Sequence, residues 1–239
     1  VPKILDKKIV IFGGKGGTGK TVCAAATGFW TAKKGKKTLV FSSDPAHSLS
    51  DVFGQKIGST ITRIRGIENL YAYEADPWIR LQELKEEFSP YIEKAVAEFG
   101  RGPVSLERDE ISNLEKINTL VSHDGGEFDL IVIDTAAGAH ALRLLESPKV
   151  ISDILERALD VFDRVIRREV KGAPTKIVAR HMVPISELRR KLSGLAMDAK
   201  KLVLILTDPE TTFITVTIAE LMGIFVTRDM IESLRKIGV

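Results

Sequence analysis

Residues 9–21 read IVIFGGKGGTGKT, an apolar run that enters a glycine-rich turn and ends in a lysine and a threonine. Ile9 to Phe12 is apolar throughout, as expected of a strand buried on both faces of a sheet. The glycines match the phosphate-loop pattern, in which backbone N–H groups face phosphate oxygens with no side chains in the way. The alanine-rich segment Thr21 to Lys34, followed by Gly35, predicts a helix whose positive end faces this loop.

The loop therefore predicts a site for ATP and Mg²⁺. Lys20 is expected to supply positive charge to the β and γ phosphates, and the Thr21 hydroxyl is expected to bind the magnesium ion. The full set of residues expected to bind nucleotide is Gly14, Lys15, Gly16, Gly17, Thr18, Gly19, Lys20, Thr21 and Val22.

Other apolar runs alternate with helical patterns along the chain. Further strands are expected at Thr38 to Ser42, Leu70 to Tyr73, Leu130 to Ile133 and Phe213 to Ile218, and a helix is expected at Met230 to Ile237. Strands that alternate with helices predict an α/β fold with a doubly wound, mainly parallel sheet.

Two long, charged stretches with helical patterns interrupt this alternation, at about Asp76 to Leu120 and about Pro148 to Leu206. We expect them to form a helical subdomain inserted into a single ATPase domain that covers residues 1–239. Leu202 to Leu206 fits either a strand or a last helical turn. A parallel sheet normally continues after a helix such as Met230 to Ile237, so a final strand is expected beyond it.

Two carboxylates follow predicted strands at the edge where sheets of this kind bind ligands. Asp44 follows Thr38 to Ser42, where a carboxylate can position or deprotonate a water molecule that faces the γ-phosphate. Asp44 could instead cap the next helix. Asp134 ends the run Leu130 to Ile133, which is the position of a Walker B carboxylate that binds magnesium directly or through water.

Composition limits the remaining classes of function. The chain carries a formal charge of +3, too small an excess to indicate nucleic-acid binding by itself. Its one cysteine, Cys23, excludes an intrachain disulfide and a four-cysteine zinc site, and this fits a cytoplasmic protein. No stretch has the length and apolar character of a membrane-spanning helix.

Lys15 is not required by an ordinary phosphate loop. With it, Lys15 to Thr21 resembles the deviant Walker A loop of the MinD, ParA, NifH and ArsA class of ATPases. The resemblance implies a homodimer in which Lys15 reaches the nucleotide of the partner subunit, and it adds Lys15 to Asp44 and Lys20 as a catalytic residue. Read without the family, Lys15 could be a solvated loop lysine.

Four later segments narrow the resemblance to the ArsA and tail-anchored-protein targeting ATPases. Ser42 to Asp51 resembles their switch I, and Asp134 to His140 resembles their switch II. Ala137, Gly138 and Ala139 replace the proline, threonine and glycine usual in that family. Leu206 to Phe213 and Thr217 to Glu220 are also similar, with Ala219 in place of a proline, and they favour a helix at Leu202 to Leu206.

The resemblance also bears on what this protein binds besides ATP. Arsenite is an unlikely ligand, because arsenite-pump subunits bind the metalloid through several cysteines. A tail-anchored membrane protein is a candidate client, although methionines suited to its apolar helix are few. No residue is assigned to adenine, because relatives read the base from the strand expected after residue 239.

Two alternative functions stay open from the sequence. One is a ParA-like or MinD-like ATPase that organises DNA or membranes, for which the basic cluster Arg164, Arg167, Arg168 and Lys171 is the supporting feature. The other is a degenerate relative that binds nucleotide without hydrolysing it, which the altered switch II residues suggest.

Overall fold

The computed structural model describes residues 4–44, 48–74, 127–137 and 196–237, with some further positions between 149 and 194. The elements follow in chain order: η1 (Ile4–Asp6), β1 (Ile9–Gly13), α1 (Lys20–Lys33), β2 (Thr38–Ser42), α2 (Ser48–Phe53), β3 (Thr62–Arg63), β4 (Leu70–Glu74), β5 (Leu130–Asp134), β6 (Thr211–Thr215) and α7 (Leu221–Ile237). Residues 196–206 are also helical.

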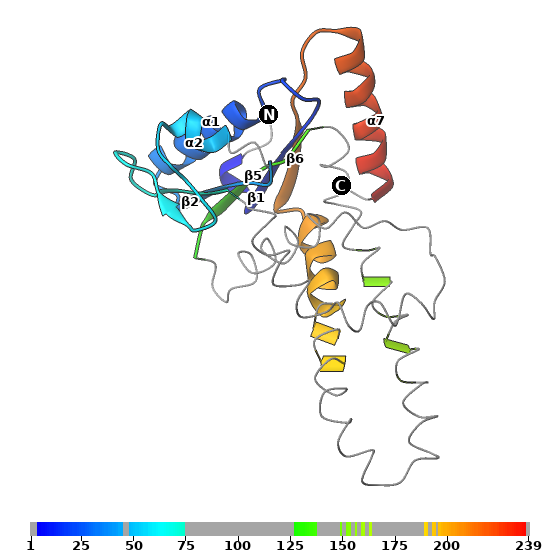
Figure 1. Ribbon diagram of the computed structural model, residues 1–239. Helices are drawn as coiled ribbons and strands as arrows, with labels where there is room; N and C mark the ends of the chain where they lie inside the picture. The colour runs from blue at the N-terminus through cyan, green and yellow to red at the C-terminus, as the bar shows by residue number, and fades with distance from the viewer. Residues whose placement is uncertain are drawn as a thin grey trace.

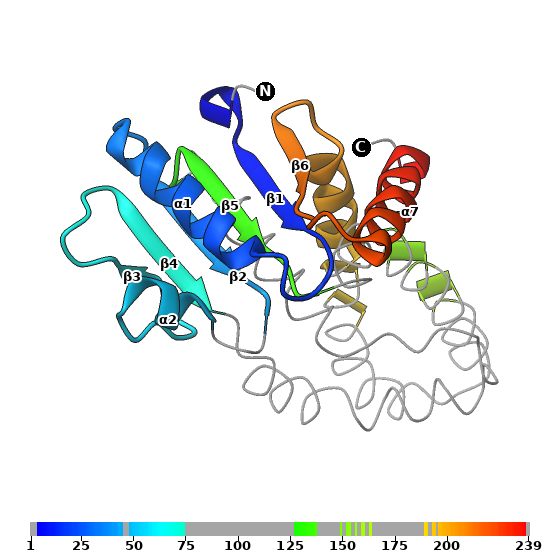
Figure 2. The ribbon, with the colours of Figure 1, turned by 90° about the horizontal axis from the view of Figure 1, so that it is seen from above.

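The described strands form one six-stranded sheet in the order β3-β4-β2-β5-β1-β6. Figure 1 shows β1, β2, β5 and β6 of this sheet, and the whole order can be followed in Figure 2. Every neighbouring pair is parallel except β3 and β4, which are antiparallel. Helix α1 connects β1 to β2 and returns the chain to the same end of the sheet, as parallel strands require. The fold is therefore the α/β sheet that the sequence predicts.

Alternate residues of β1 face opposite sides of the sheet, and both sides are covered. Ile9 and Ile11 belong to a core with Leu202 and Leu206 of the helical residues 196–206, and Met230 and Leu234 of α7 complete that layer. Val10 and Phe12 face the other core, which contains alanines of α1. Figure 2 shows α1 across one face and α7 beside β6.

Close approach of α1 to the sheet depends on one glycine. A Cβ atom on Gly28 would lie 2.3 Å from Val40 Cγ2 on β2 and 3.3 Å from Leu70 Cδ1 on β4. Atoms at such distances overlap, so only glycine allows this helix to pack so closely against the sheet. The position of α1 matters because its first residues carry the phosphate-loop lysine and threonine.

Five expected elements are confirmed, with small differences at their ends. The strand Thr38 to Ser42 has the expected bounds, and β4 and β5 each extend one residue further, to Glu74 and Asp134. β1 likewise extends to Gly13, and α1 starts and ends one residue earlier than expected. Residues 202–206 are helical, as the resemblance favoured.

The last strand and the last helix differ from the expectation. β6 runs over Thr211–Thr215 and not Phe213 to Ile218, because its pairing with β1 begins at Ile9 and Thr211. α7 begins at Leu221, nine residues before Met230. Several apolar side chains in its first turns are exposed, so they do not show the one-sided pattern of a buried helix. The short α2 is a helix that follows Asp44, and its bounds were not predicted.

The expected insertion at Asp76 to Leu120 lies outside the described residues, and the insertion at Pro148 to Leu206 is described only in part. That these two insertions form a separate helical subdomain stays a prediction. Within the described ranges, no helix has the length and apolar character needed to cross a membrane.

Candidate active site

The loop between β1 and α1 has the backbone of a phosphate cradle. Gly17 and Gly19 have φ angles of 75° and 91°, in the left-handed region that glycine adopts without strain. Gly14 has a φ of 148°, and a Cβ atom there would lie 2.1 Å from the carbonyl oxygen of Val216. The loop thus turns tightly beside the segment after β6, and α1 begins immediately after Gly19.

Two side chains hold the loop in a curled conformation around one carbonyl group. The Lys20 ammonium donates a hydrogen bond to the Lys15 carbonyl oxygen at 3.0 Å, and the Thr18 hydroxyl donates to the same oxygen at 2.9 Å. Lys20 is only 6% exposed, so its charge lies inside the loop. A buried ammonium at the start of a helix forms a strong field for an anion.

Lys15 itself points elsewhere. Its ammonium forms an ion pair with the Glu220 carboxylate, just before α7. Both side chains remain partly exposed, at 39% and 42%. Lys15 and Lys20 therefore differ sharply in environment, although both belong to the same loop. Val22, the last residue of the expected nucleotide-binding set, is 59% exposed on α1.

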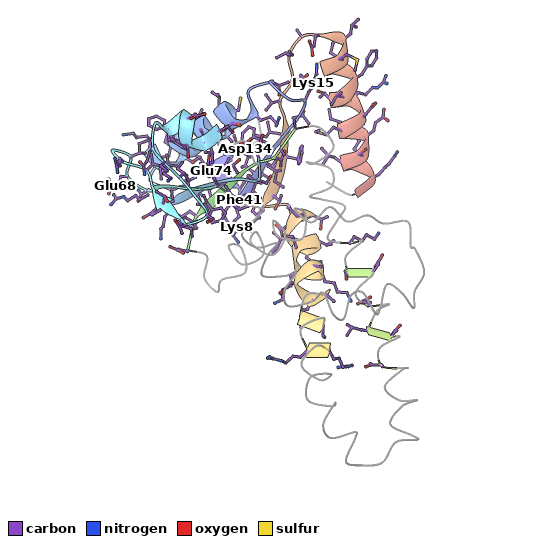
Figure 3. All side chains as sticks on the ribbon, viewed as in Figure 1. Lys8, Lys15, Phe41, Glu68, Glu74 and Asp134 are labelled. Carbon is purple, nitrogen blue, oxygen red and sulfur yellow. The ribbon has the colours of Figure 1, made fainter. Side chains whose placement is uncertain are left out.

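The carboxyl ends of β2 and β5 place three polar groups beside the loop. Ser42 pairs in register with Asp134, and its hydroxyl donates a hydrogen bond to Asp134 Oδ2 at 3.3 Å. The Asp44 N–H donates to the Ser42 hydroxyl oxygen at 3.2 Å. The structure thus brings Asp44 and Asp134 to one edge through Ser42, and Figure 3 labels Asp134 with Lys15 and Glu74.

Asp134 is a buried carboxylate, and one of its oxygens has no hydrogen-bond partner among the described residues. The residue is fully buried, and within that part of the chain Asp134 Oδ1 forms no hydrogen bond. Burial raises the pKa of Asp134 from 3.8 to about 6, and the nearby Asp44 charge acts in the same direction. The Thr21 hydroxyl, the Lys20 charge and the Ser42 hydroxyl lower this pKa, but they do not outweigh desolvation.

These groups fit a magnesium ion. The Thr21 hydroxyl lies 3.2 Å from the Ser48 hydroxyl at the start of α2, and Thr21 also lowers the pKa of the Asp134 carboxyl. Magnesium prefers oxygen ligands and usually binds through one or two carboxylates, with phosphate and water completing its shell. A cation would also offset the cost of burying the Asp134 charge.

A model of the anion-transporting ATPase family, ArsA_ATPase, matches residues 7–239. The chain belongs to this family. The family is one of ATPases, so ATP is its expected substrate, and the match covers both the phosphate loop and the two strand-end carboxylates.

Individual relatives agree with the family assignment. The chain is 31% identical to ATPase ASNA1 homolog 1 of Paramecium tetraurelia, across 97% of this chain and 72% of that protein. It is 30% identical to ATPase asna-1 of Caenorhabditis elegans, across 100% and 74%. It is 29% identical to ATPase GET3 of Kluyveromyces lactis, across 94% and 67%.

Sequence reasoning missed several residues that take part in the site. Ser42 and Ser48 were read only as parts of a motif, and Glu220 only as part of a late segment. Glu74 ends β4 exactly as Asp134 ends β5, so the rule that identified Asp134 would also have identified Glu74. Residues 45–47 and 138–145, which include His47 and the last three residues of switch II, lie outside the described residues.

The raised pKa of Asp134 predicts a pH-dependent cost to the ligand-free fold. The folded protein holds the proton more tightly than the unfolded chain, so this group's contribution to stability falls as pH rises from about 4 to about 6. Asp134→Asn removes the buried charge and is expected to raise the free energy of unfolding at pH 8 by on the order of 1–3 kcal/mol. Near pH 4 this gain in the free energy of unfolding should vanish.

Urea denaturation in EDTA at pH 8 and at pH 4 measures the two free energies, with Asp6→Asn as an exposed control. An equal gain for Asp134→Asn at both pH values would contradict the prediction.

Proposed function

We propose that this family member hydrolyses Mg-ATP at the site formed by the phosphate loop, Asp44 and Asp134. The buried Asp134 carboxylate, whose Oδ1 has no hydrogen-bond partner among the described residues, is the observation that carries the proposal, because the Thr21 hydroxyl and the Lys20 charge both act on this group. Thr21 and Asp134 would hold magnesium, which supplies positive charge to the phosphates when bound. The amides of residues 14–22 and the Lys20 ammonium would bind the phosphate oxygens.

Asp44 is the group that we assign to the attacking water. Its N–H bonds to Ser42, which also bonds to Asp134, so Asp44 is fixed relative to the proposed magnesium ligand. A carboxylate held there can accept a hydrogen bond from water and orient it toward the γ-phosphate. The Ser50 N–H in the first turn of α2 bonds to Glu74, so this amide does not need Asp44 as a cap.

The role of Asp44 predicts a separation of hydrolysis from binding. Asp44→Asn keeps the shape of the side chain but loses its charge, and turnover is expected to fall by about 100-fold or more. The affinity for Mg-ADP should stay within about threefold, because Asp44 is not assigned to the phosphates or the cation. Phosphate release and calorimetry measure the two quantities. Asp6→Asn, at an exposed carboxylate before β1, is the matched control, and unchanged turnover in Asp44→Asn would reject the assignment.

We further propose that the protein works as a homodimer in which Lys15 acts on the partner's nucleotide. Support comes from the resemblance of Lys15 to Thr21 to deviant Walker A loops, and from the difference between the two lysines. Lys20 is buried within its own loop, whereas Lys15 extends from it to a partly exposed ion pair with Glu220. An exposed side chain of this length can exchange one anionic partner for another at little cost.

Mixing two inactive variants distinguishes action across the interface from action within one chain. Lys15→Ala and Asp44→Asn are each expected to be nearly inactive. If Lys15 acts on the partner's site, a mixed dimer contains one complete site, so an equal mixture should recover about a quarter of wild-type turnover. Lys34→Ala, at an exposed lysine after α1, is the control for loss of charge. No recovery, with mixed dimers demonstrated, would place Lys15 in its own site.

The client that we propose is a membrane protein with a carboxyl-terminal membrane-spanning helix. Support is limited to the resemblance of Ser42 to Asp51 and the other quoted segments to the tail-anchored-protein targeting ATPases. A switch whose closed, ATP-bound state binds client and whose ADP-bound state releases it would use hydrolysis to drive a cycle of capture and release.

This client class predicts nucleotide-dependent binding of a defined probe. Asp44→Asn with Mg-ATP is expected to keep in solution a fusion protein that ends in about 20 apolar residues. Capture should be several times weaker with Mg-ADP. The same fusion with two arginines inside its apolar segment is the control, because it cannot span a membrane. Equal capture of both fusions, or no capture, would leave an ATPase of this family with another client.

A further inference from the structure

Glu74 is a fully buried carboxylate that the proposed reaction does not use. It ends β4 and pairs in register with Ser42 of β2, which in turn pairs with Asp134 of β5. These three residues therefore lie side by side across three neighbouring strands at the carboxyl edge of the sheet. Burying a carboxylate is costly unless its oxygens receive hydrogen bonds.

Both oxygens of Glu74 receive hydrogen bonds from one residue of α2. The Ser50 N–H donates to Glu74 Oε1 at 2.9 Å, and the Ser50 hydroxyl donates to Glu74 Oε2 at 2.8 Å. The Ser50 hydroxyl oxygen also accepts the N–H of Ile57 at 3.0 Å, and the Glu74 N–H donates to the Gly58 carbonyl at 3.0 Å. Glu74 thus fixes both the start of α2 and the turn that follows it.

The start of α2 lies in the proposed site. Ser48, two residues before Ser50, contacts the Thr21 hydroxyl, and Leu49 between them is fully buried in the core beneath α1. On the other side of the same switch segment, the Asp44 N–H is bonded to Ser42. Asp44 and Ser50, on either side of residues 45–47, are therefore each attached to the sheet, Asp44 through Ser42 and Ser50 through Glu74.

We propose that Glu74 is a positioning residue for ATP hydrolysis, which acts through Ser50 to fix the start of α2, four residues beyond Asp44. The inference rests on the proposed function, because it assumes that Asp44 orients the attacking water. Two hydrogen bonds to one residue restrain both the position and the direction of the first turn of α2. A nucleophile displaced by about 1 Å can react on the order of 100-fold more slowly, so loss of this attachment would slow turnover.

The attachment depends on acceptor geometry, and this makes a conservative variant informative. In Glu74→Gln the amide oxygen can still accept the Ser50 N–H, while the amide NH₂ faces the Ser50 hydroxyl oxygen. That hydroxyl proton can then turn to the Ile57 carbonyl oxygen, which lies 3.4 Å away. Glutamine can therefore retain the attachment, whereas alanine removes it and opens space beneath α2.

The test compares turnover with nucleotide affinity in three variants. Glu74→Ala is expected to lower kcat by about tenfold or more while the Kd for Mg-ADP stays within about threefold. Glu74→Gln should restore most of the kcat. Ser50→Ala, which keeps the backbone hydrogen bond, should lower kcat by a smaller factor. This variant provides the test if Glu74→Ala does not fold. Phosphate release at saturating ATP and calorimetry with Mg-ADP supply the two readings.

A matched control removes a buried helix-to-sheet hydrogen bond at the opposite end of β2. The Thr31 and Thr38 hydroxyls lie 3.0 Å apart, and both residues are fully buried. Thr38→Val is expected to lower the Tm without changing kcat measured below the Tm. If folded Glu74→Ala and Ser50→Ala both keep wild-type kcat, or if kcat and affinity fall together as in a general loss of structure, the proposal is overturned.

Failure of this inference can be told apart from failure of the proposed function by including Asp44→Asn. Impaired turnover in Asp44→Asn with wild-type turnover in the Glu74 and Ser50 variants rejects only the positioning role. Wild-type turnover in Asp44→Asn rejects the proposed role of Asp44, and with it the route by which Glu74 would act.

Discussion

Parallel pairing of β2 with both of its neighbours is the constraint on which the site depends. It aligns Glu74, Ser42 and Asp134 at one level, where the three strands end and the chain leaves the sheet. Because all three side chains are fully buried, their hydrogen bonds are made within the protein: Ser42 bonds to Asp134 and to the Asp44 N–H, and Glu74 bonds to Ser50 of α2. A slip of one residue in either pairing would turn these side chains to the other face.

Electrostatics at this edge are unbalanced in the ligand-free protein. Desolvation raises the pKa of Asp134 although a lysine and two hydroxyl groups act against it. The phosphate loop has the opposite imbalance, since the buried Lys20 ammonium donates only to the carbonyl group of Lys15 among the hydrogen bonds described for it. An anion above the loop and a cation beside Asp134 would relieve both costs at once. This complementarity favours a site for a metal-bound polyphosphate over a site for either ion alone.

Much of this fold could be predicted because its signals are local. The run Ile9 to Phe12 and the glycines after it are determined by burial on two faces and by backbone conformations that only glycine adopts freely. The edges of the sheet were harder to predict. β6 has one neighbour in the described sheet and is only partly buried, so its apolar pattern is weak, and its bounds follow from pairing with β1. In the site, Ser42 and Glu74 act through hydrogen bonds to residues distant in the sequence. A strand-end position is a local signal that could have identified Glu74, but its contact with Ser50 could not be read from any local pattern.

The two lysines of the phosphate loop differ in burial, and this difference gives similar side chains different freedom to move. Lys20 is held in a desolvated position, where its charge is strong and its geometry fixed. Lys15 is held by Glu220 through an ion pair in which both side chains are well exposed, and pairs of that kind contribute only about 0–1 kcal/mol. A polyphosphate carries several charges and would compete well for such a lysine. The contact within one chain is therefore compatible with a Lys15 that changes partners, whereas Lys20 has no comparable freedom.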